Sequence, residues 1–218
     1  YSGMIIENYS EELEAPFEVN MNTQRYSYFG SDLLQNGGEI GLHGYNHVPL
    51  CLENFETEVI GETGLSQSYE YDYWKSKENM RASMEELVRF TSDLFPDATL
   101  QVYAPPANIL SADGRQMLVE DFPQIKAIAG VYTEGNLGYA QEFEVAADGI
   151  IEIPRIISGL VINPFMEISA LSELNLHYVN SHYQTPDEVM DADYNAQAGW
   201  ESMKEHFTEY LDWLYTSA

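Results

Sequence analysis

The sequence predicts an α/β protein with mostly parallel strands. Strand-like and helix-like runs alternate along the chain, which gives five or six β–α units in series. The chain has 218 residues, of which 44% are hydrophobic, enough apolar material for a substantial core. Without repeats or a linker, we expect a single domain over residues 1–218. Either a (β/α) barrel or an open doubly wound sheet satisfies the alternation, and in both the functional residues follow the carboxyl ends of the strands.

The first quarter of the chain supplies two expected helices and two expected strands. Residues 4–13 place a few apolar side chains among polar ones, as an amphipathic helix does. Residues 17–21 alternate apolar and polar side chains, which is typical of a strand. A short helix containing Leu33 and Leu34 follows, and residues 38–42 form a compact strand that enters a loop.

The middle of the chain contains the most regular helical pattern. Residues 69–95 carry apolar side chains at helical spacing and end before Pro96. A strand at 100–103, a helix at 112–119 and a strand at 125–131 then continue the alternation.

The last third repeats the same order of elements. The pair Asp148–Gly149 is a turn signal before a strand at 150–157. A helix at 165–174, a strand at 176–180 and a final amphipathic helix at 199–214 complete the chain.

The charge excludes several classes of partner. Nine basic and 36 acidic residues give a formal net charge of −27, which repels nucleic-acid phosphates and anionic lipid headgroups. No apolar run reaches the roughly 18–20 residues of a membrane span, so we expect no membrane insertion. Such a charge attracts a cationic or metal-bearing partner, or simply keeps the protein soluble. A single cysteine, Cys51, excludes an intrachain disulfide.

Two histidines directly after a predicted strand are the most informative feature. Residues 38–47 read GEIGLHGYNH, with His43 and His47 four positions apart. A helical turn between them would bring both imidazoles to one point, where they suit zinc or a related divalent ion. Two ligands do not complete a site, and an isolated H-x-x-x-H is also found as a pair of loop histidines without metal.

This segment resembles the second motif of the polysaccharide deacetylase superfamily (NodB homology domains, carbohydrate esterase family four). The motif reads G-H-E-I-G-x-H-[ST]-x-x-H, and both ligand positions are intact here, although Gly38 and Gly44 replace two other motif residues. The strand at 17–21 is similar to the superfamily's second strand, and the closing stretch from 181 onward resembles a bacterial branch of the superfamily. The resemblance implies a deformed (β/α) barrel and the removal of N-acetyl groups from a polysaccharide.

The resemblance also implies roles for individual residues. His43 and His47 would hold one divalent metal ion, with zinc as the expected ion. His182 would protonate the departing amine, a role that suits a group titrating near neutrality; a surface loop histidine is the alternative. Arg155 would orient the catalytic carboxylate as the fourth motif's arginine does, although an ordinary ion pair suits it equally.

The third motif of the family is represented only in part. Residues 101–108 read QVYAPPAN, where the family has an Arg-x-Pro-Tyr-like segment. By this resemblance Tyr103 would place its ring against the sugar and Asn108 would make a polar contact. The prolines could instead simply end the strand.

The family's first strand ends in an Asp-Asp pair that supplies the catalytic base and a metal ligand, and no such pair precedes Phe17. We therefore expect the chain to be truncated at its N-terminus and to lack that first strand, unless this branch has lost the aspartates. The acidic loop at 187–195 fails the calcium-loop pattern, because Ala196 and Ser202 stand where a glycine and a glutamate are needed.

Three functions are compatible with these residues to different degrees. The first is a metal-dependent deacetylase acting on an N-acetylated polysaccharide, outside the cell or at the bacterial surface. The second is a catalytically incomplete module of the same fold that binds carbohydrate or assembles with other components. The third, a glycosidase, would require two opposed carboxylates, and no spacing identifies such a pair.

Overall fold

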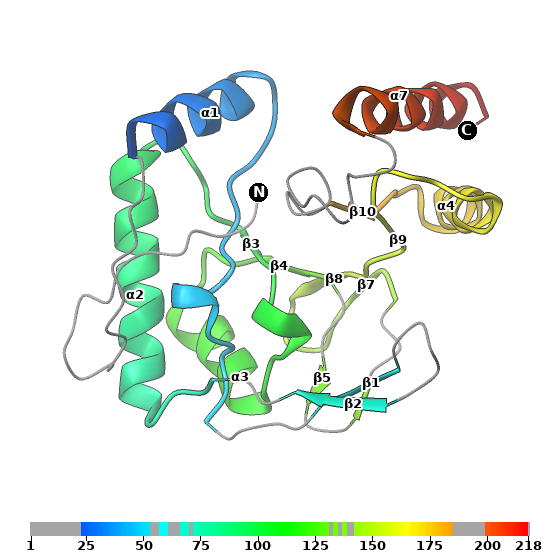
Figure 1. Cartoon of the computed structure of the whole chain (residues 1–218). Helices are drawn as coiled ribbons and strands as arrows, with labels where there is room; N and C mark the ends of the chain where they lie inside the picture. The colour runs from blue at the N-terminus through cyan, green and yellow to red at the C-terminus, as the bar shows by residue number, and fades with distance from the viewer. Residues whose placement is uncertain are drawn as a thin grey trace. The chain divides into compact units, whose positions relative to one another are not determined.

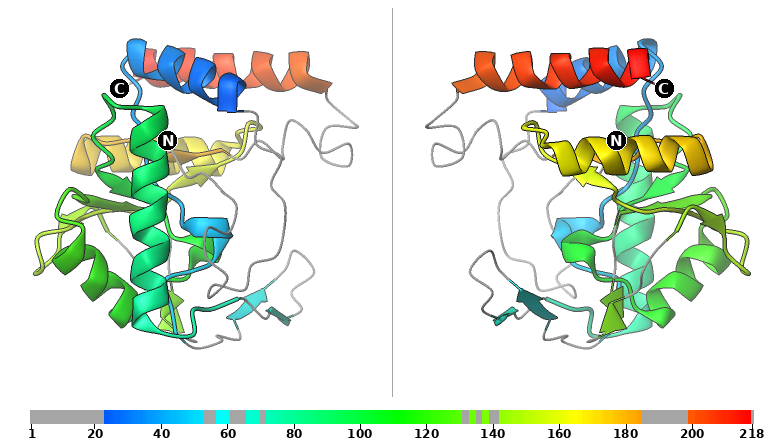
Figure 2. Two further views of the ribbon diagram at one scale, coloured as in Figure 1. Left: turned by 90° about the vertical axis from the view of Figure 1, so that its left-hand side faces the viewer. Right: turned by 90° about the vertical axis from the view of Figure 1, so that its right-hand side faces the viewer.

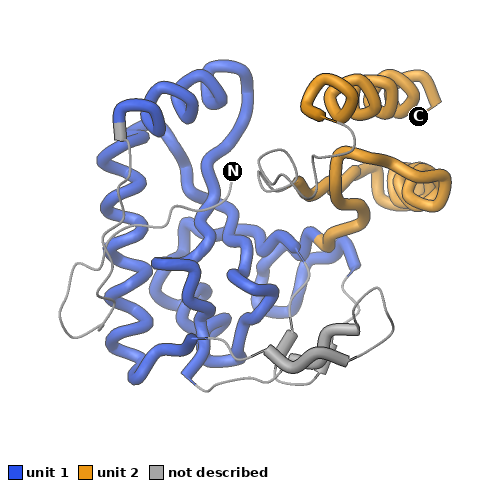
Figure 3. The backbone as a smooth tube through the Cα atoms, viewed as in Figure 1, with its two compact units in different colours: residues 1–153 blue, residues 154–218 orange. Residues whose placement is uncertain are grey.

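The computed structural model describes residues 23–52, 57–60, 66–69, 72–130, 133–134, 137–138, 142–184 and 199–217. The chain divides into two compact units, Tyr1–Ile153 and Pro154–Ala218, which Figure 3 distinguishes by colour. We describe each unit by itself, and the expectation of a single domain stays a prediction. Among the described helices, none combines the length and the apolar character needed to cross a membrane.

A four-stranded sheet forms the centre of the first unit (Figure 1). Its strand order is β3 (Val102–Tyr103), β4 (Ala127–Ala129), β8 (Ile151–Ile153) and β7 (Glu144–Val145). The pairs β3–β4 and β4–β8 are parallel, and β7 pairs antiparallel with β8. A parallel bridge joins Leu42 to Tyr103, so the segment leading to His43 lies beside β3. The protein is therefore a mixed α/β protein with a mostly parallel sheet, and over the described residues this sheet does not close into a barrel.

Two antiparallel hairpins accompany this sheet. One consists of β1 (Thr57–Ile60) and β2 (Ser66–Tyr69), and the other of β5 (Thr133–Glu134) and β6 (Leu137–Gly138).

The described residues of the first unit form three α-helices, α1 (Thr23–Gln35), α2 (Lys77–Leu94) and α3 (Ala112–Asp121). Figures 1 and 2 show α1 lying crosswise over the C-terminal end of α2. A serine caps each of the other two helices, because Ser76 Oγ accepts from Asn79 N and Ser111 Oγ accepts from Gly114 N. Each cap satisfies one backbone N–H that the first helical turn leaves without a partner.

The core of the first unit lies between the sheet and the helices. The α2 side chains of Met80, Met84 and Leu87 are fully buried, and Ile128 of β4 and Leu118 of α3 meet them in the same cluster. Burial of this kind supplies most of the stability of such a domain, at about 25 cal/mol per Å² of apolar surface. Cys51 is buried as well and forms no disulfide.

In the second unit, the residues that the structure describes form a small β–α–β arrangement and one further helix. Strand β9 (Ile157–Ser158) pairs parallel with β10 (His182–Tyr183), and α4 (Pro164–His177) connects them along the chain. Asn163 caps α4 by accepting from two backbone N–H groups. The last helix, α7 (Gly199–Ser217), contributes Tyr210 to a cluster with Ile157 and Ala170.

The predicted elements are confirmed in type for most of the described chain. Helices lie at the predicted places around Leu33 and at 112–119, 165–174 and 199–214, and short strands lie within 100–103 and 125–131. The helix predicted at 69–95 begins only at Lys77, because β2 ends at Tyr69 and Ser76 is the cap. The predictions for 4–13 and 17–21 lie outside the described residues.

Two strand predictions in the last third are wrong in detail. The strand expected at 150–157 is interrupted, because Pro154 has no N–H to donate to a ladder, and it becomes β8 and β9. The strand expected at 176–180 does not form. There α4 continues to His177 and ends at Tyr178, whose φ of 60° is left-handed, and the strand follows at His182.

Candidate functional site

The two histidine rings lie next to each other, in the loop that follows the bridge between Leu42 and Tyr103. The ring centroids of His43 and His47 are 4.9 Å apart, and the ring planes meet at 75°. Sequence spacing suggested a helical turn, but the chain between the rings makes a short 3₁₀ turn, Tyr45–His47, in which Asn46 (φ 52°) and His47 (φ 58°) are left-handed. The pair of rings therefore depends on an unusual backbone conformation.

One hydrogen bond fixes the tautomer of His43. Its Nδ1 lies 2.7 Å from the carbonyl oxygen of Ala104, and a carbonyl can only accept, so Nδ1 carries the proton. In the neutral ring the lone pair is then on Nε2. A histidine whose second nitrogen is anchored by a carbonyl is the usual arrangement for a metal-ligating imidazole.

His47 differs from His43 in its surroundings. The residue as a whole is exposed, but partial burial of its ring disfavours the charged imidazolium and lowers the pKa of His47. A lower pKa keeps the ring neutral, and therefore able to bind a metal ion, at more acidic pH.

A second turn of the same shape stands beside the first. Residues Pro106–Asn108 make a 3₁₀ turn in which Ala107 (φ 52°) and Asn108 (φ 58°) are left-handed. Parallel bridges join Leu42 to Tyr103 before the two turns and Leu50 to Leu110 after them. His47 and Asn108 thus occupy the same position, the last residue, in two matched turns.

Gly44 lets the two turns approach closely. Its φ is 80°, and a Cβ at this position would lie 2.6 Å from Pro106 Cγ. In the sequence, Gly44 departs from the Ser/Thr of the deacetylase motif. In this structure only glycine combines the left-handed backbone with the contact to Pro106.

The two histidines are suitable metal ligands by type, but two ligands are too few to complete a site. They offer imidazole nitrogens, which suit zinc and related divalent ions. Within the described residues, however, no group of three or more histidine, cysteine or acidic side chains is arranged to hold a metal ion. The described part of the chain thus supplies two ligands, and the source of a third is unassigned.

Tyr103 does not occupy the position expected for a sugar-stacking ring. Its exposed fraction is 0%, it belongs to the core of the first unit, and burial raises the pKa of its phenol well above the ordinary value. The expectation that Tyr103 lies against a sugar therefore does not agree with its burial, whereas Asn108 is only partly buried.

Sequence reasoning missed Asn46, which lies between the two histidines. Both polar atoms of its carboxamide are buried, and neither has a hydrogen-bond partner among the described residues. The signal was present in the sequence, since asparagine directly after Gly–Tyr is one of the few residues that tolerates a left-handed turn.

The other two predicted catalytic residues belong to the second unit. His182 lies on β10, and its Nε2 donates to the Gly159 carbonyl oxygen at 2.6 Å. The edge of its ring meets the rings of Phe207 and Tyr210, and its Nδ1 is buried without a hydrogen-bond partner among the described residues. Neutral His182 therefore carries its lone pair on Nδ1.

Arg155 lies against an aromatic ring. Its guanidinium carbon is 4.0 Å from the ring centroid of Tyr183, a cation–π contact within the second unit. Of the remaining two histidines, His177 lies in the last turn of α4 beside Glu173, and His206 is exposed on α7. The acidic loop at 187–195 is outside the described residues.

Comparison with known proteins assigns the chain to a family. No curated protein matches the chain. A family model described as "uncharacterised protein conserved in bacteria (DUF2194)" matches residues 1–218, the whole length of the sequence. The chain therefore belongs to the bacterial DUF2194 family.

Proposed function

We propose that this chain is a metal-dependent deacetylase-like domain that removes N-acetyl groups from a polysaccharide outside the cell or at its surface. The observation that supports the proposal most is the pair of imidazoles, 4.9 Å apart, at the carboxyl edge of a mostly parallel sheet. The proposed fold is a deformed (β/α) barrel, of which the parallel strands β3, β4 and β8 would form part.

His43 and His47 are the proposed ligands of one divalent ion, with zinc as the preferred candidate. When bound, such an ion stabilises the negative charge that develops on the carbonyl oxygen during amide hydrolysis and lowers the pKa of a bound water. The Ala104 carbonyl would hold the His43 ring so that Nε2 carries the lone pair. By the resemblance to polysaccharide deacetylases, aspartates would supply the remaining ligand and the catalytic base.

Asn108 and Asn46 are the proposed polar contacts to the substrate. Both belong to the two matched left-handed turns next to the imidazoles. An amide side chain can donate to and accept from an acetamido group at the same time. Tyr103 has no part in the proposal, because its ring is in the core.

His182 is the proposed acid that gives a proton to the departing amine. Its Nε2 is bonded to the Gly159 carbonyl oxygen and its Nδ1 is buried beside Phe207 and Tyr210, so this role requires the ring to turn before it can reach a substrate. Arg155 is the residue proposed to orient the catalytic carboxylate, and within the second unit its guanidinium lies over the ring of Tyr183, the neighbour of His182 in β10.

A metal titration tests the central claim. Zn²⁺ or Co²⁺ added to the full-length protein should bind with a stoichiometry of about one, because the two imidazoles are already adjacent. His43→Ala and His47→Ala should each weaken binding at least about tenfold. His206→Ala is the matched control, since His206 is an exposed histidine on α7, and it should bind as the unmodified protein does.

Acetate release from an N-acetylated polysaccharide, measured on the same proteins, tests the reaction. Loss of activity in the His43 and His47 variants but not in the His206 variant would support hydrolysis. Equal rates in all of them would exclude it.

The second candidate is a module of the same fold that binds carbohydrate without hydrolysing it. It is favoured by the finding that the described residues supply only two metal ligands. Sugar binding by the full-length protein, without metal binding and without acetate release, would establish this function in place of the first.

A further inference from the structure

A polar hollow lies beside α1, and neither His43 nor His47 is among the residues that line it. It has a volume of about 740 Å³ and is formed by one side of α1 together with Leu94, the last residue of α2. Small-molecule sites in proteins have volumes of roughly 300–1,000 Å³. The hollow is therefore large enough for a ligand of a few rings.

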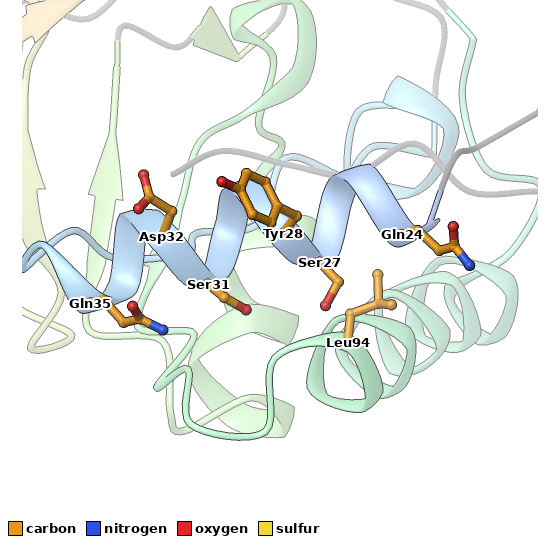
Figure 4. Close-up of a pocket in the computed structure, with 7 residues that line it drawn as sticks. All are labelled: Gln24, Ser27, Tyr28, Ser31, Asp32, Gln35 and Leu94. Carbon is orange, nitrogen blue, oxygen red and sulfur yellow. The ribbon is translucent and has the colours of Figure 1, made fainter.

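The side of α1 that lines the hollow consists of short polar side chains. Gln24, Ser27, Ser31 and Gln35 recur at intervals of three or four residues, so they follow one another along the helix. Figure 4 shows these four side chains in a row on the side of Leu94, with Tyr28 and Asp32 on the opposite margin. Two amides and two hydroxyls offer both donors and acceptors over the length of the helix.

The charge of the residues that line the hollow restricts the charge of a ligand that could bind there. The seven lining residues include one carboxylate, Asp32, and no cation. The whole chain carries a net charge of −27. An anionic ligand would therefore be repelled, whereas a neutral ligand with many hydroxyl groups would find hydrogen-bond partners.

An exposed aromatic ring stands at the margin of the hollow. The Tyr28 side chain has an exposed fraction of 70%, and its ring meets the Phe29 ring edge to face at 5.2 Å. An exposed aromatic ring beside amide and hydroxyl groups offers an apolar face to the C–H side of a sugar, with a polar rim around it.

The walls of the hollow are held in place by close packing. A Cβ at Gly30 of α1 would lie 2.3 Å from Phe95 Cε1, and the rings of Tyr26 and Phe95 have centroids 6.3 Å apart. Phe95 directly follows Leu94, so α1 and the end of α2 are packed against each other. A preformed site loses less entropy when a ligand binds.

We infer that this hollow is a binding site for a neutral oligosaccharide, with Tyr28 as its stacking ring and the two glutamines as its main hydrogen-bonding groups. The inference does not use the histidine pair. It assigns to α1 a role in holding a carbohydrate chain that is independent of any chemistry at His43 and His47.

Calorimetry on the full-length protein tests the inference with two neutral probes, maltotriose and triacetylchitotriose, and one anionic probe, trigalacturonate. At least one neutral probe should bind more tightly than the anionic one. Tyr28→Ala and Gln35→Ala should each raise its Kd about tenfold, the equivalent of about 1.4 kcal/mol. Tyr215→Ala is the matched control, since Tyr215 on α7 is 84% exposed and should be replaceable without effect.

The inference would be overturned by no heat from either neutral probe at about 10 mM, by equal affinities of the Tyr28 and Tyr215 variants, or by tighter binding of the anionic probe. The His43→Ala variant separates this site from the proposed function. Binding that is lost in that variant but kept in Tyr28→Ala places the sugar at the histidines and overturns the inference, while it leaves the proposed function standing.

Discussion

At the scale of single residues, Asn46 carries the most strain in the candidate site. It has a left-handed backbone, and the two polar atoms of its carboxamide are buried without a hydrogen-bond partner in the described part of the chain. Each feature lowers stability by about 1–3 kcal/mol in general, although asparagine tolerates the left-handed region better than most residues. Residues that are unfavourable for folding are often kept for binding.

Replacing Asn46 by glycine is therefore expected to stabilise the protein. Glycine removes the buried amide and adopts a positive φ freely, and these gains exceed its own entropic penalty. We expect the free energy of unfolding to rise by about 1 kcal/mol, measured by urea denaturation. Asn46→Ala, which keeps a Cβ in the left-handed region, should gain less. A clear loss of stability in the glycine variant would contradict this view of Asn46.

A second residue-scale effect concerns Asp148 and pH. Hydrogen bonds from Arg115, at 2.6 and 3.0 Å, and from the backbone N–H of Ile150 lower the pKa of Asp148. The folded state therefore binds the proton less readily than the unfolded state, whose aspartate pKa is about 3.9. The resulting stabilisation is present above that pH and is lost as the pH falls through the lower, folded-state pKa.

Asp148→Asn should remove this contribution. We expect unfolding free energies at about pH 3 and pH 6 to differ less in the variant than in the unmodified protein, by at most about 1 kcal/mol because the pair is partly exposed. The measurement is urea unfolding of both proteins at both pH values. An identical difference in the two proteins would show that the Arg115–Asp148 pair makes no net contribution.

At the scale of elements, the amphipathic pattern predicted helices well and short strands poorly. The apolar spacing in α2 determines its core-facing side, so Met80, Met84 and Leu87 could be located from sequence. The exposed residues Leu176, Tyr178 and Val179 resemble a strand in composition, yet the left-handed cap at Tyr178 places them at the end of a helix. Strands of two residues contain too few side chains for an alternation to be recognised.

The candidate site was predictable from sequence only in part. The adjacency of the His43 and His47 rings agrees with the prediction, but the backbone that produces it does not. The strand expected at 38–42 is only a bridge at Leu42, and a left-handed 3₁₀ turn replaces the expected helical turn. The burial of Tyr103 was not predictable, since tyrosine is found both in cores and on surfaces. Its position depends on neighbours, such as Leu42, that are paired with it only in the folded chain.

The cap of α3 allows a test at the element scale. Ser111 Oγ accepts from Gly114 N at 3.0 Å and donates to the Leu50 carbonyl oxygen at 2.8 Å, so one buried hydroxyl both begins the helix and joins it to the loop after the histidines. Ser111→Ala should lower the free energy of unfolding by about 2 kcal/mol, as the sum of a lost cap and a lost buried hydrogen bond.

Ser76→Ala provides the comparison for this prediction. Ser76 caps α2 with one hydrogen bond in a less buried position, and its loss should lower the unfolding free energy by about 1 kcal/mol. Chemical denaturation of both variants gives the two values. A loss at Ser76 equal to or larger than that at Ser111 would show that the link to Leu50 adds nothing.

At the scale of the whole molecule, charge is the dominant property. Several ion pairs hold basic residues beside acidic ones, among them Arg81–Asp121 and Lys77–Asp113, but nine basic residues cannot neutralise 36 acidic ones. The excess negative charge repels itself in the compact state. Salt shortens the range of this repulsion to about 8 Å at 0.15 M.

Added salt is therefore expected to stabilise the protein. The urea midpoint should rise between about 0.01 M and 0.15 M NaCl, since screening weakens repulsion more than it weakens the few exposed ion pairs. Potassium chloride serves as the control for specific ion effects and should give the same rise. A midpoint that is constant or falls with salt would show that the ion pairs outweigh the net repulsion.

The buried thiol of Cys51 has a practical consequence. As the sole sulfhydryl of the chain, and one with 1% of its surface exposed, it can react with an alkylating reagent only after the surrounding structure opens. The rate of alkylation in dilute, non-denaturing buffer therefore measures transient opening of the structure around Cys51, whose carbonyl oxygen accepts a hydrogen bond from the backbone N–H of Trp74. No cysteine has to be introduced to measure this rate.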